Sequence, residues 1–224
     1  MNNLVKISQP TGLVLLADVR GSRERGNPVA GLDELRNRAE SANQRFAADL
    51  LVPFSISGGD EIQALLTSPA ALWEIVEHLD LVTGEPIFRF GCGVGALQTA
   101  IAARSWEMDG ACFHLAREAI ERGKLEQRWA AFAGFGAPFD GTLDALARSL
   151  QVIREDWTER QREALVARKN HESQKETAEA MGIDPTTLSK MLNAAHAKEY
   201  REIQHATAQL LTGWWEEGHG GLRD

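Results

Sequence analysis

Apolar positions in the first half of the chain alternate between strand-like runs and helical periodicity. Residues 11–19 (TGLVLLADV) form a near-continuous apolar run, which is typical of a strand buried on both faces. Apolar side chains then recur at steps of three or four from Leu32 to Leu50, which predicts an amphipathic helix. Two short strands joined by Gly58-Gly59 predict a hairpin. Downstream, the pattern predicts a helix from Ser68 to His78, a strand over 87–97, a helix over 110–122 and a strand over 129–135.

This order of elements, β-α-β-β-α-β-α-β with a hairpin in the middle, predicts an α+β fold. An antiparallel or mixed sheet covered by helices would form a ferredoxin-like palm domain. From about Gly141 onward glycine nearly vanishes, strand patterns stop, and the chain has the pattern of successive helices. We therefore expect a palm domain over residues 1–140, a connecting helix over 141–156 and an all-α domain over 157–224.

The clearest local motif lies at residues 174–196, QKETAEAMGIDPTTLSKMLNAAH. Gly182 fits the left-handed end of one short helix, and Asp184 before Pro185 fits the start of the next. This pattern resembles the helix-turn-helix of bacterial regulators, which implies a DNA-binding domain. The alternative is a helical hairpin used only for packing or dimerisation. In the DNA-binding interpretation the second helix presents the polar side chains Thr186, Thr187, Ser189, Lys190 and Asn193.

Charge and composition limit the classes of partner. The 224 residues carry 24 Lys and Arg against 32 Asp and Glu, a formal net charge of −8, which argues against a protein that coats nucleic acid by bulk charge. Basic and acidic side chains are equal in number between Trp157 and His205, so useful binding of double-stranded DNA would require a homodimer. No apolar run approaches the roughly 20 residues of a membrane span. With no secretory signal visible, we expect a cytoplasmic protein.

Two acidic residues stand at strand ends or turns of the first domain. Asp18 ends the first apolar strand, and Asp60 lies beside the hairpin tip in the sequence SGGDE. Such carboxylates suit Mg²⁺, which binds a few hard oxygen ligands together with phosphate oxygens. The backbone amides after Asp18, freed by Gly21, could cradle a phosphate. The alternatives are conformational, with Asp60 as a hairpin residue and Asp18 as a loop cap.

Four segments make this part of the chain resemble nucleotidyl cyclases. ADVRGS (17–22) is similar to the first metal motif of class III nucleotidyl cyclases, and SGGDEIQALL (57–66) to the second-metal hairpin of cyclases and of GGDEF diguanylate cyclases. FRFGCGVGAL (88–97) and MDGACFHLAREA (108–119) resemble the strand and helix that complete the cyclase active site. In this order, with a terminal helix-turn-helix, the segments resemble the SatD family over essentially the whole chain.

The resemblance implies a nucleotide site that holds a divalent cation, Mg²⁺ or Mn²⁺. Asp18 and Asp60 match the two metal-binding aspartates, and Glu61 matches the additional acidic ligand of GGDEF enzymes. Val19 would offer a backbone carbonyl to the metal. The positions that would hold the nucleotide are Arg20, Gly21 and Ser22 for the phosphates and Glu107 for the base.

Other positions depart from the cyclase pattern. Ile56 stands where cyclases have the base-selecting lysine, and His114 stands at the transition-state asparagine. The family arginine falls at Glu118, with Arg117 one position early, and one residue on a helix rotates a side chain by about 100°. Losing one charge aimed at the reacting phosphate typically costs two or three orders of magnitude in rate. His114 and Arg117 are thus altered candidates for the catalytic positions, a combination that favours nucleotide binding over cyclisation.

Together these features predict a homodimeric, DNA-binding transcriptional regulator whose cyclase-like domain binds a nucleotide with a divalent metal. The alternative is an active metal-dependent nucleotidyl cyclase, or a related nucleotide-converting enzyme, regulated by its helical domain. A third possibility is an adaptor in which neither site works.

Overall fold

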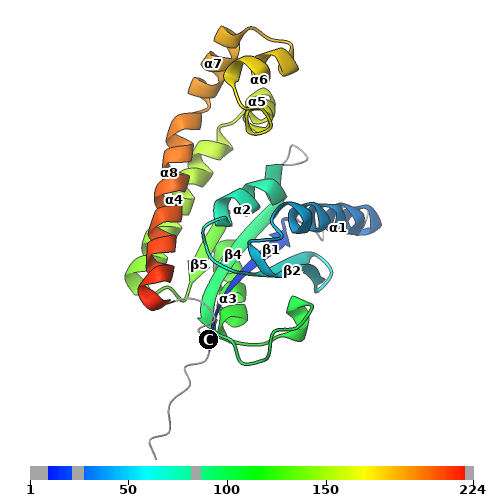
Figure 1. The fold of residues 1–224 in the computed structure, drawn as a ribbon, viewed down its shortest axis with the longest axis vertical. Coiled ribbons are helices and arrows are strands. Elements are labelled where there is room, and N and C mark those ends of the chain that lie inside the picture. The colour runs from blue at the N-terminus through cyan, green and yellow to red at the C-terminus, as the bar shows by residue number, and fades with distance from the viewer. Residues whose placement is uncertain (1–9, 22–27, 82–86, 220–224) are drawn as a thin grey trace, which may run out of the picture.

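The computed structural model of the chain describes residues 10–21, 28–81 and 87–219. Figure 1 shows a sheet packed among helices, with two long helices running side by side past it to a group of short ones. The strands are β1 (Thr11–Val19), β2 (Leu50–Ser57), β3 (Glu61–Leu66), β4 (Phe88–Ala96) and β5 (Ala130–Ala133). The helices are α1 (Pro28–Arg45), α2 (Leu72–Leu81), η1 (Ser105–Glu107), α3 (Ala111–Leu125), α4 (Ala137–Glu155), α5 (Glu159–Lys169), α6 (Gln174–Met181), α7 (Pro185–Ala194), α8 (Ala197–Trp214) and η2 (Trp215–His219).

The strands form one sheet in the order β2-β3-β1-β4-β5. Among the described strands, β5 alone pairs in parallel, with β4, while the other pairs are antiparallel. The predicted α+β fold with a mixed sheet covered by helices is confirmed. The central place of β1 explains its apolar run, because Leu13 and Leu15 face one helical layer while Val14 and Leu16 face the other.

Helices cover the two faces of this sheet unequally. α1, α2, α4 and α8 share one core with Phe90 and Trp129, whereas α3 packs on the opposite face against Val14 and Leu65. α3 approaches β4 closely, since a Cβ atom on Gly93 would lie 2.2 Å from the backbone nitrogen of Ala116. The glycines of β4 therefore serve helix packing.

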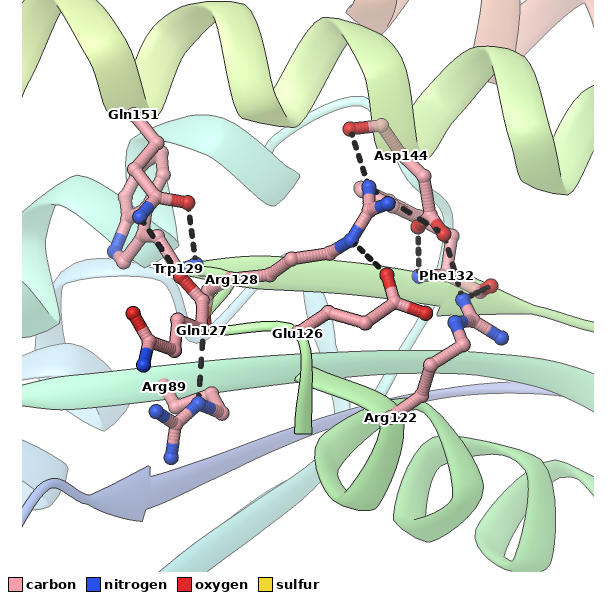
Figure 2. Close-up of polar contacts among 9 residues, drawn as sticks. All are labelled: Arg89, Arg122, Glu126, Gln127, Arg128, Trp129, Phe132, Asp144 and Gln151. Carbon is pink, nitrogen blue, oxygen red and sulfur yellow. Dashed lines mark hydrogen bonds and ion pairs between the residues drawn. The ribbon is translucent and has the colours of Figure 1, made fainter. Parts of the chain in front are cut away.

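Side chains cover both edges of the sheet. At β5, Asp144 of α4 accepts a hydrogen bond from the Phe132 N–H at 2.9 Å (Figure 2). At β2, Asn43 of α1 accepts from the Phe54 N–H at 2.7 Å and donates to the Phe54 carbonyl at 3.0 Å. These bonds satisfy backbone groups that would otherwise be open to pairing with another strand.

α4 is part of the layer that covers the sheet. It begins at Ala137, earlier than the connecting helix expected from Gly141, because Gly136 adopts a φ of +100° and a proline occupies the first turn. Gln151 of α4 accepts from the Trp129 N–H at 2.8 Å and donates to the Gln127 carbonyl at 3.0 Å (Figure 2). The helix thus fixes the strand that it covers.

A buried ion pair ties this layer together. Asp80 of α2 and Arg154 of α4 lie 2.5 Å apart, and Asp80 also accepts from the Ile87 N–H at 2.9 Å and from Trp129 Nε1 at 3.0 Å. The Arg154 guanidinium stacks 3.8 Å from the centre of the Trp129 ring. Because breaking a buried pair leaves an uncompensated charge, this contact strongly restrains α4 against α2.

The C-terminal helices form a second, smaller core. α5, α6 and α7 pack around Ala164, Ala178 and Leu188. α8 then returns along α4 (Figure 1), and its Tyr200 and Trp214 join the main core. The apolar residues of α8 therefore pack in the core of this chain. No helix in the described part of the chain is long and apolar enough to cross a membrane.

Candidate functional site

An acidic pair forms where β1 ends and β3 begins. Asp18 and Glu61 are direct partners across the antiparallel ladder, so their side chains emerge on the same face of the sheet. That face is the one covered by α3, since Val14 and Leu16 of the same strand pack there. Both residues are largely buried, with exposed fractions of 6% and 8%. The fold thus brings two predicted metal ligands together.

Two cations from α3 meet this acidic pair. Lys124 Nζ lies 3.5 Å from Asp18 Oδ2, and Arg117 Nη1 donates to Glu61 Oε1 at 3.0 Å. The two cations are about two helical turns apart, so they project from the same side of α3. Arg117, expected to be rotated away from the phosphate position, therefore lies at the acidic pair. Lys124 was not predicted, although its helical spacing from Arg117 was visible in the sequence.

Burial and the neighbouring carboxylates leave Asp18 less acidic than usual. Burial raises the pKa of Asp18, and the charges of Asp60 and Glu61 raise it further, while Lys124 opposes them. Burial acts to lower the pKa of Lys124, but its contacts with Glu121 and Asp18 outweigh burial and raise it. Asp60 therefore belongs electrostatically to the same cluster as Asp18 and Glu61.

Glycine turns position the backbone around the pair. Gly58 and Gly59 adopt φ values of +71° and +94° in the hairpin, and the carbonyl of Asp60 accepts from the Val19 N–H at 3.1 Å. Gly21 has a φ of +64°, as a turn after β1 requires. The predicted phosphate residue Ser22 lies outside the described residues.

Arg20 turns toward the buried ion pair. Its backbone N–H donates to the Ile87 carbonyl at 2.7 Å. Burial lowers the pKa of its side chain, and the neighbouring charges that act on it include Asp80 and Arg154. Its Nε is buried with no hydrogen-bond partner among the described residues. In the structure the side chain of this predicted phosphate ligand is therefore influenced by Asp80 and Arg154, near the C-terminal ends of α2 and α4.

The remaining predicted site residues lie at the surface or in the core. His114 Nε2 lies 3.1 Å from Asp109 Oδ1, with both side chains mainly exposed. Glu107 is exposed on η1, which docks onto the sheet where Ser105 Oγ donates to the Gln63 carbonyl at 3.0 Å. Ile56 packs against the main core. None of these contacts joins them to the acidic pair.

The acidic pair fits a hard cation held by few protein ligands. Mg²⁺ usually keeps several waters and binds one or two carboxylates plus phosphate oxygens. A cation would also offset the burial and the negative charges of Asp60 and Glu61, which raise the pKa of Asp18. Within the described residues, no three His, Cys, Asp or Glu side chains converge on a metal site made by the protein alone. Asp18 and Glu61 therefore suit a cation that arrives with a phosphate, and Mg²⁺ or Mn²⁺ stays a prediction.

The second candidate surface lies on α6 and α7. Gly182 ends α6 at a φ of +64°, and Asp184 caps α7 by accepting from the Thr186 N–H at 2.7 Å. Leu188 and Leu192 of α7 are buried against α5 and α6. The predicted DNA-contacting side chains Thr186, Thr187, Lys190 and Asn193 are exposed, and Ser189 is half-buried. The structure brings these five residues together on one short helix at the end of the molecule (Figure 1).

Comparison with known proteins gives one family and several structural neighbours. The SatD family model matches residues 13–211. The fold is similar to that of a bacterial light-regulated adenylyl cyclase, at 16% identity and a TM-score of 0.40, over 55% of this chain and 75% of that one. It is also similar to the guanylyl cyclase Cya2, at 16% identity and a TM-score of 0.31, over 51% of this chain and 71% of that one. No curated protein matches the chain.

Proposed function

The chain belongs to the SatD family, and from that premise we propose that it is a DNA-binding transcriptional regulator whose sheet domain binds a nucleotide with Mg²⁺ or Mn²⁺. The observation that best supports the DNA-binding part of the proposal is the exposed surface of α7. Its apolar residues lock it to α5 and α6, while Thr186, Lys190 and Asn193 are free of that core and exposed. A helix held in this way, with a polar outer face, is suited to enter the major groove of DNA.

The chemistry of this face suits both base edges and phosphates. Asn193 offers the paired donor and acceptor that recognise adenine, and Lys190 suits guanine or a phosphate. The hydroxyls of Thr186 and Thr187 at the start of α7 suit phosphate oxygens. Because the local charge is balanced, one copy would bind weakly, so we propose a homodimer that places two α7 helices in successive major grooves.

The acidic pair supports the nucleotide half of the proposal. A bound Mg²⁺ would neutralise the carboxylates and bind phosphate oxygens of the nucleotide. Asp18 and Glu61 would then hold the cation, and Lys124 and Arg117 would be released from them to contact the phosphates. Regulation would require that the nucleotide binds two dimer arrangements with different free energies. α8 offers the connection, since it follows α7 directly and packs in the core with α2 and α4.

Fluorescence anisotropy tests the DNA half of the proposal. The full chain is titrated onto a labelled duplex from the region upstream of its own gene and onto a random duplex, at several salt concentrations. We expect tighter, salt-sensitive binding of the upstream duplex. Lys190→Ala should lower the salt slope by about 1, and Asn193→Ala should cost about 1–3 kcal/mol and relax sequence preference. Arg148→Ala, an exposed cation of α4, is the matched control. Absence of salt-sensitive binding, or an equal loss in the control, would exclude the proposal.

A second candidate function is nucleotide cyclisation, and one observation favours it. Arg117 and Lys124 both reach the acidic pair from α3, so cationic groups are present where a triphosphate would react. Incubation of the protein with each nucleoside triphosphate and Mn²⁺, followed by chromatography, decides between the two functions. A cyclic product that disappears in Asp18→Ala and Asp60→Ala would establish the enzyme. The regulator proposal expects binding without product.

A further inference from the structure

A cavity of about 670 Å³ lies where α2 meets α5 and α8, on the opposite face of the sheet from the acidic pair. Part of its wall is apolar and aromatic, formed by Phe46, Trp73, Val166 and Ala208. Trp73 is itself held rigidly, since its ring stacks on that of Trp129 with centroids 5.7 Å apart. A volume of this size, with a preformed aromatic wall, is typical of small-molecule sites.

Two nitrogen donors in the cavity lining have no acceptor in the part of the chain that the structure describes. Trp73 Nε1 and Gln204 Nε2 are buried, and neither has a hydrogen-bond partner among the described residues. The Trp73 side chain is only 3% exposed. Buried hydrogen-bond donors are nearly always satisfied in folded proteins. Two unpaired donors that line the same cavity therefore indicate that a ligand supplies the acceptor.

The charged lining indicates that this acceptor is negative. Arg45, Lys169 and Arg201 line the cavity against Glu74 and Glu77, so the cations are in excess. Glu77 is buried and forms an ion pair with Lys169. Burial, together with the charges of Arg45 and Arg201, lowers the pKa of Lys169 to about 8, although Glu74 opposes them. An anion between these cations would relieve their mutual repulsion.

We propose that this cavity binds a small organic anion with a flat apolar ring. The ring would lie against Trp73 and Phe46, and the acidic group would accept hydrogen bonds within reach of Arg201 and Lys169. Such a ligand would contact the sheet layer through α2 and the helical part through α5 and α8. The site shares no residue with the acidic pair or with the exposed face of α7, so it is independent of the proposed nucleotide and DNA sites.

Fluorescence titration of the full chain with 8-anilinonaphthalene-1-sulfonate tests the site, because this probe combines flat rings with one negative group. The neutral analogue N-phenyl-1-naphthylamine reports the contribution of the charge. We expect saturable one-to-one binding of the sulfonate, at least about tenfold tighter than that of the neutral probe. The melting temperature should rise with probe concentration, as binding to the folded state requires.

Variants locate the binding. Ala208→Phe, which adds a phenyl ring to the cavity wall, should strongly weaken saturable binding, and Arg201→Glu should weaken it about tenfold or more. Lys198→Glu is the matched control on the same helix, since its side chain is 79% exposed and does not line the cavity. Asp18→Asn should also bind the probe as the wild type does. Circular dichroism verifies that each variant is folded. Equal affinity for the neutral probe, or unchanged binding in folded Ala208→Phe and Arg201→Glu, would overturn the proposal.

Discussion

The charge on Asp18 lowers the stability of the folded protein. Its pKa is raised above the ordinary 3.8 by burial and by Asp60 and Glu61, despite Lys124. The folded state therefore binds a proton more readily than the unfolded state in the range just above 3.8. In that range stability falls as the pH rises, so the charged Asp18 destabilises the folded protein at higher pH. Such local destabilisation is common where carboxylates are gathered for function.

The substitution Asp18→Asn should therefore stabilise the protein. We expect its melting temperature at neutral pH to rise by a few degrees, roughly the effect of 1 kcal/mol in a chain of this size. The gain should shrink as the pH is lowered, because the wild-type carboxyl then becomes protonated. Differential scanning calorimetry across this pH range measures both effects. Asp33→Asn, at an exposed pair with Arg36, should change little. A lower melting temperature for Asp18→Asn would mean that the contact with Lys124 dominates.

At the candidate site, the sequence predicted best those residues that lie at the ends of strands. The resemblance to cyclases and GGDEF enzymes implied Asp18 and Glu61 as metal ligands, but the β1–β3 pairing that places the two side by side was seen only in the structure. The contribution of α3 was harder to foresee, because it depends on how closely the helix packs on β4 and on long side chains that reach across the gap. Arg117 reaches Glu61 for this reason, and Lys124 reaches Asp18. The DNA-contacting residues are predicted from a motif, and their role stays a prediction.

At the scale of elements, the sequence pattern predicted each described strand and helices that correspond to α1, α2, α3, α4, α6 and α7, while the pairing of the strands needed the structure. The parallel alignment of β5 follows from its connection to β4 through α3. β5 is also shorter than the predicted 129–135, since Gly134 adopts a φ of +95° and turns the chain toward α4. The covering role of α4 depends on Asp144 and Gln151, polar residues whose buried bonds to β5 no hydropathy pattern indicates.

The packing of α3 on β4 should be intolerant of a single methyl group. A Cβ on Gly93 would lie 2.2 Å from the Ala116 nitrogen and 2.3 Å from the Cys112 carbonyl oxygen, both backbone atoms that cannot rotate away. Gly93→Ala should therefore lower the free energy of unfolding by about 1–3 kcal/mol or more. Gly141 lies on α4, and a Cβ added there would meet no atom within 4 Å beyond its chain neighbours and the adjacent helix backbone. Gly141→Ala should therefore raise the free energy of unfolding by about 0.5–1 kcal/mol. Urea denaturation measures both, and equal stability of the two variants would contradict this packing.

At the scale of the whole molecule, one core extends from the sheet to the last helix. Trp157 packs edge-on against Tyr200 with ring centroids 4.8 Å apart, and Trp214 lies 4.9 Å from Phe135 beside β5. Residues on both sides of the domain boundaries expected near 140 and 156 therefore belong to the same hydrophobic core. The small core of α5, α6 and α7 is attached to this larger one through α8.

This continuity predicts a single cooperative unfolding transition. Calorimetric and van't Hoff enthalpies should agree, and tryptophan fluorescence and circular dichroism should report the same midpoint. Trp214→Ala, at a side chain 9% exposed, should lower the free energy of unfolding by about 3–5 kcal/mol and shift the entire transition. Trp106→Ala, at a tryptophan 51% exposed on η1, is the matched control and should leave the midpoint nearly unchanged. Two resolved transitions, with Trp214→Ala moving only one of them, would instead establish that the sheet and the C-terminal helices unfold as separate units. In that case a signal from the proposed nucleotide site could not reach α7 through the shared core, because α8 would be free to move independently of α2 and α4.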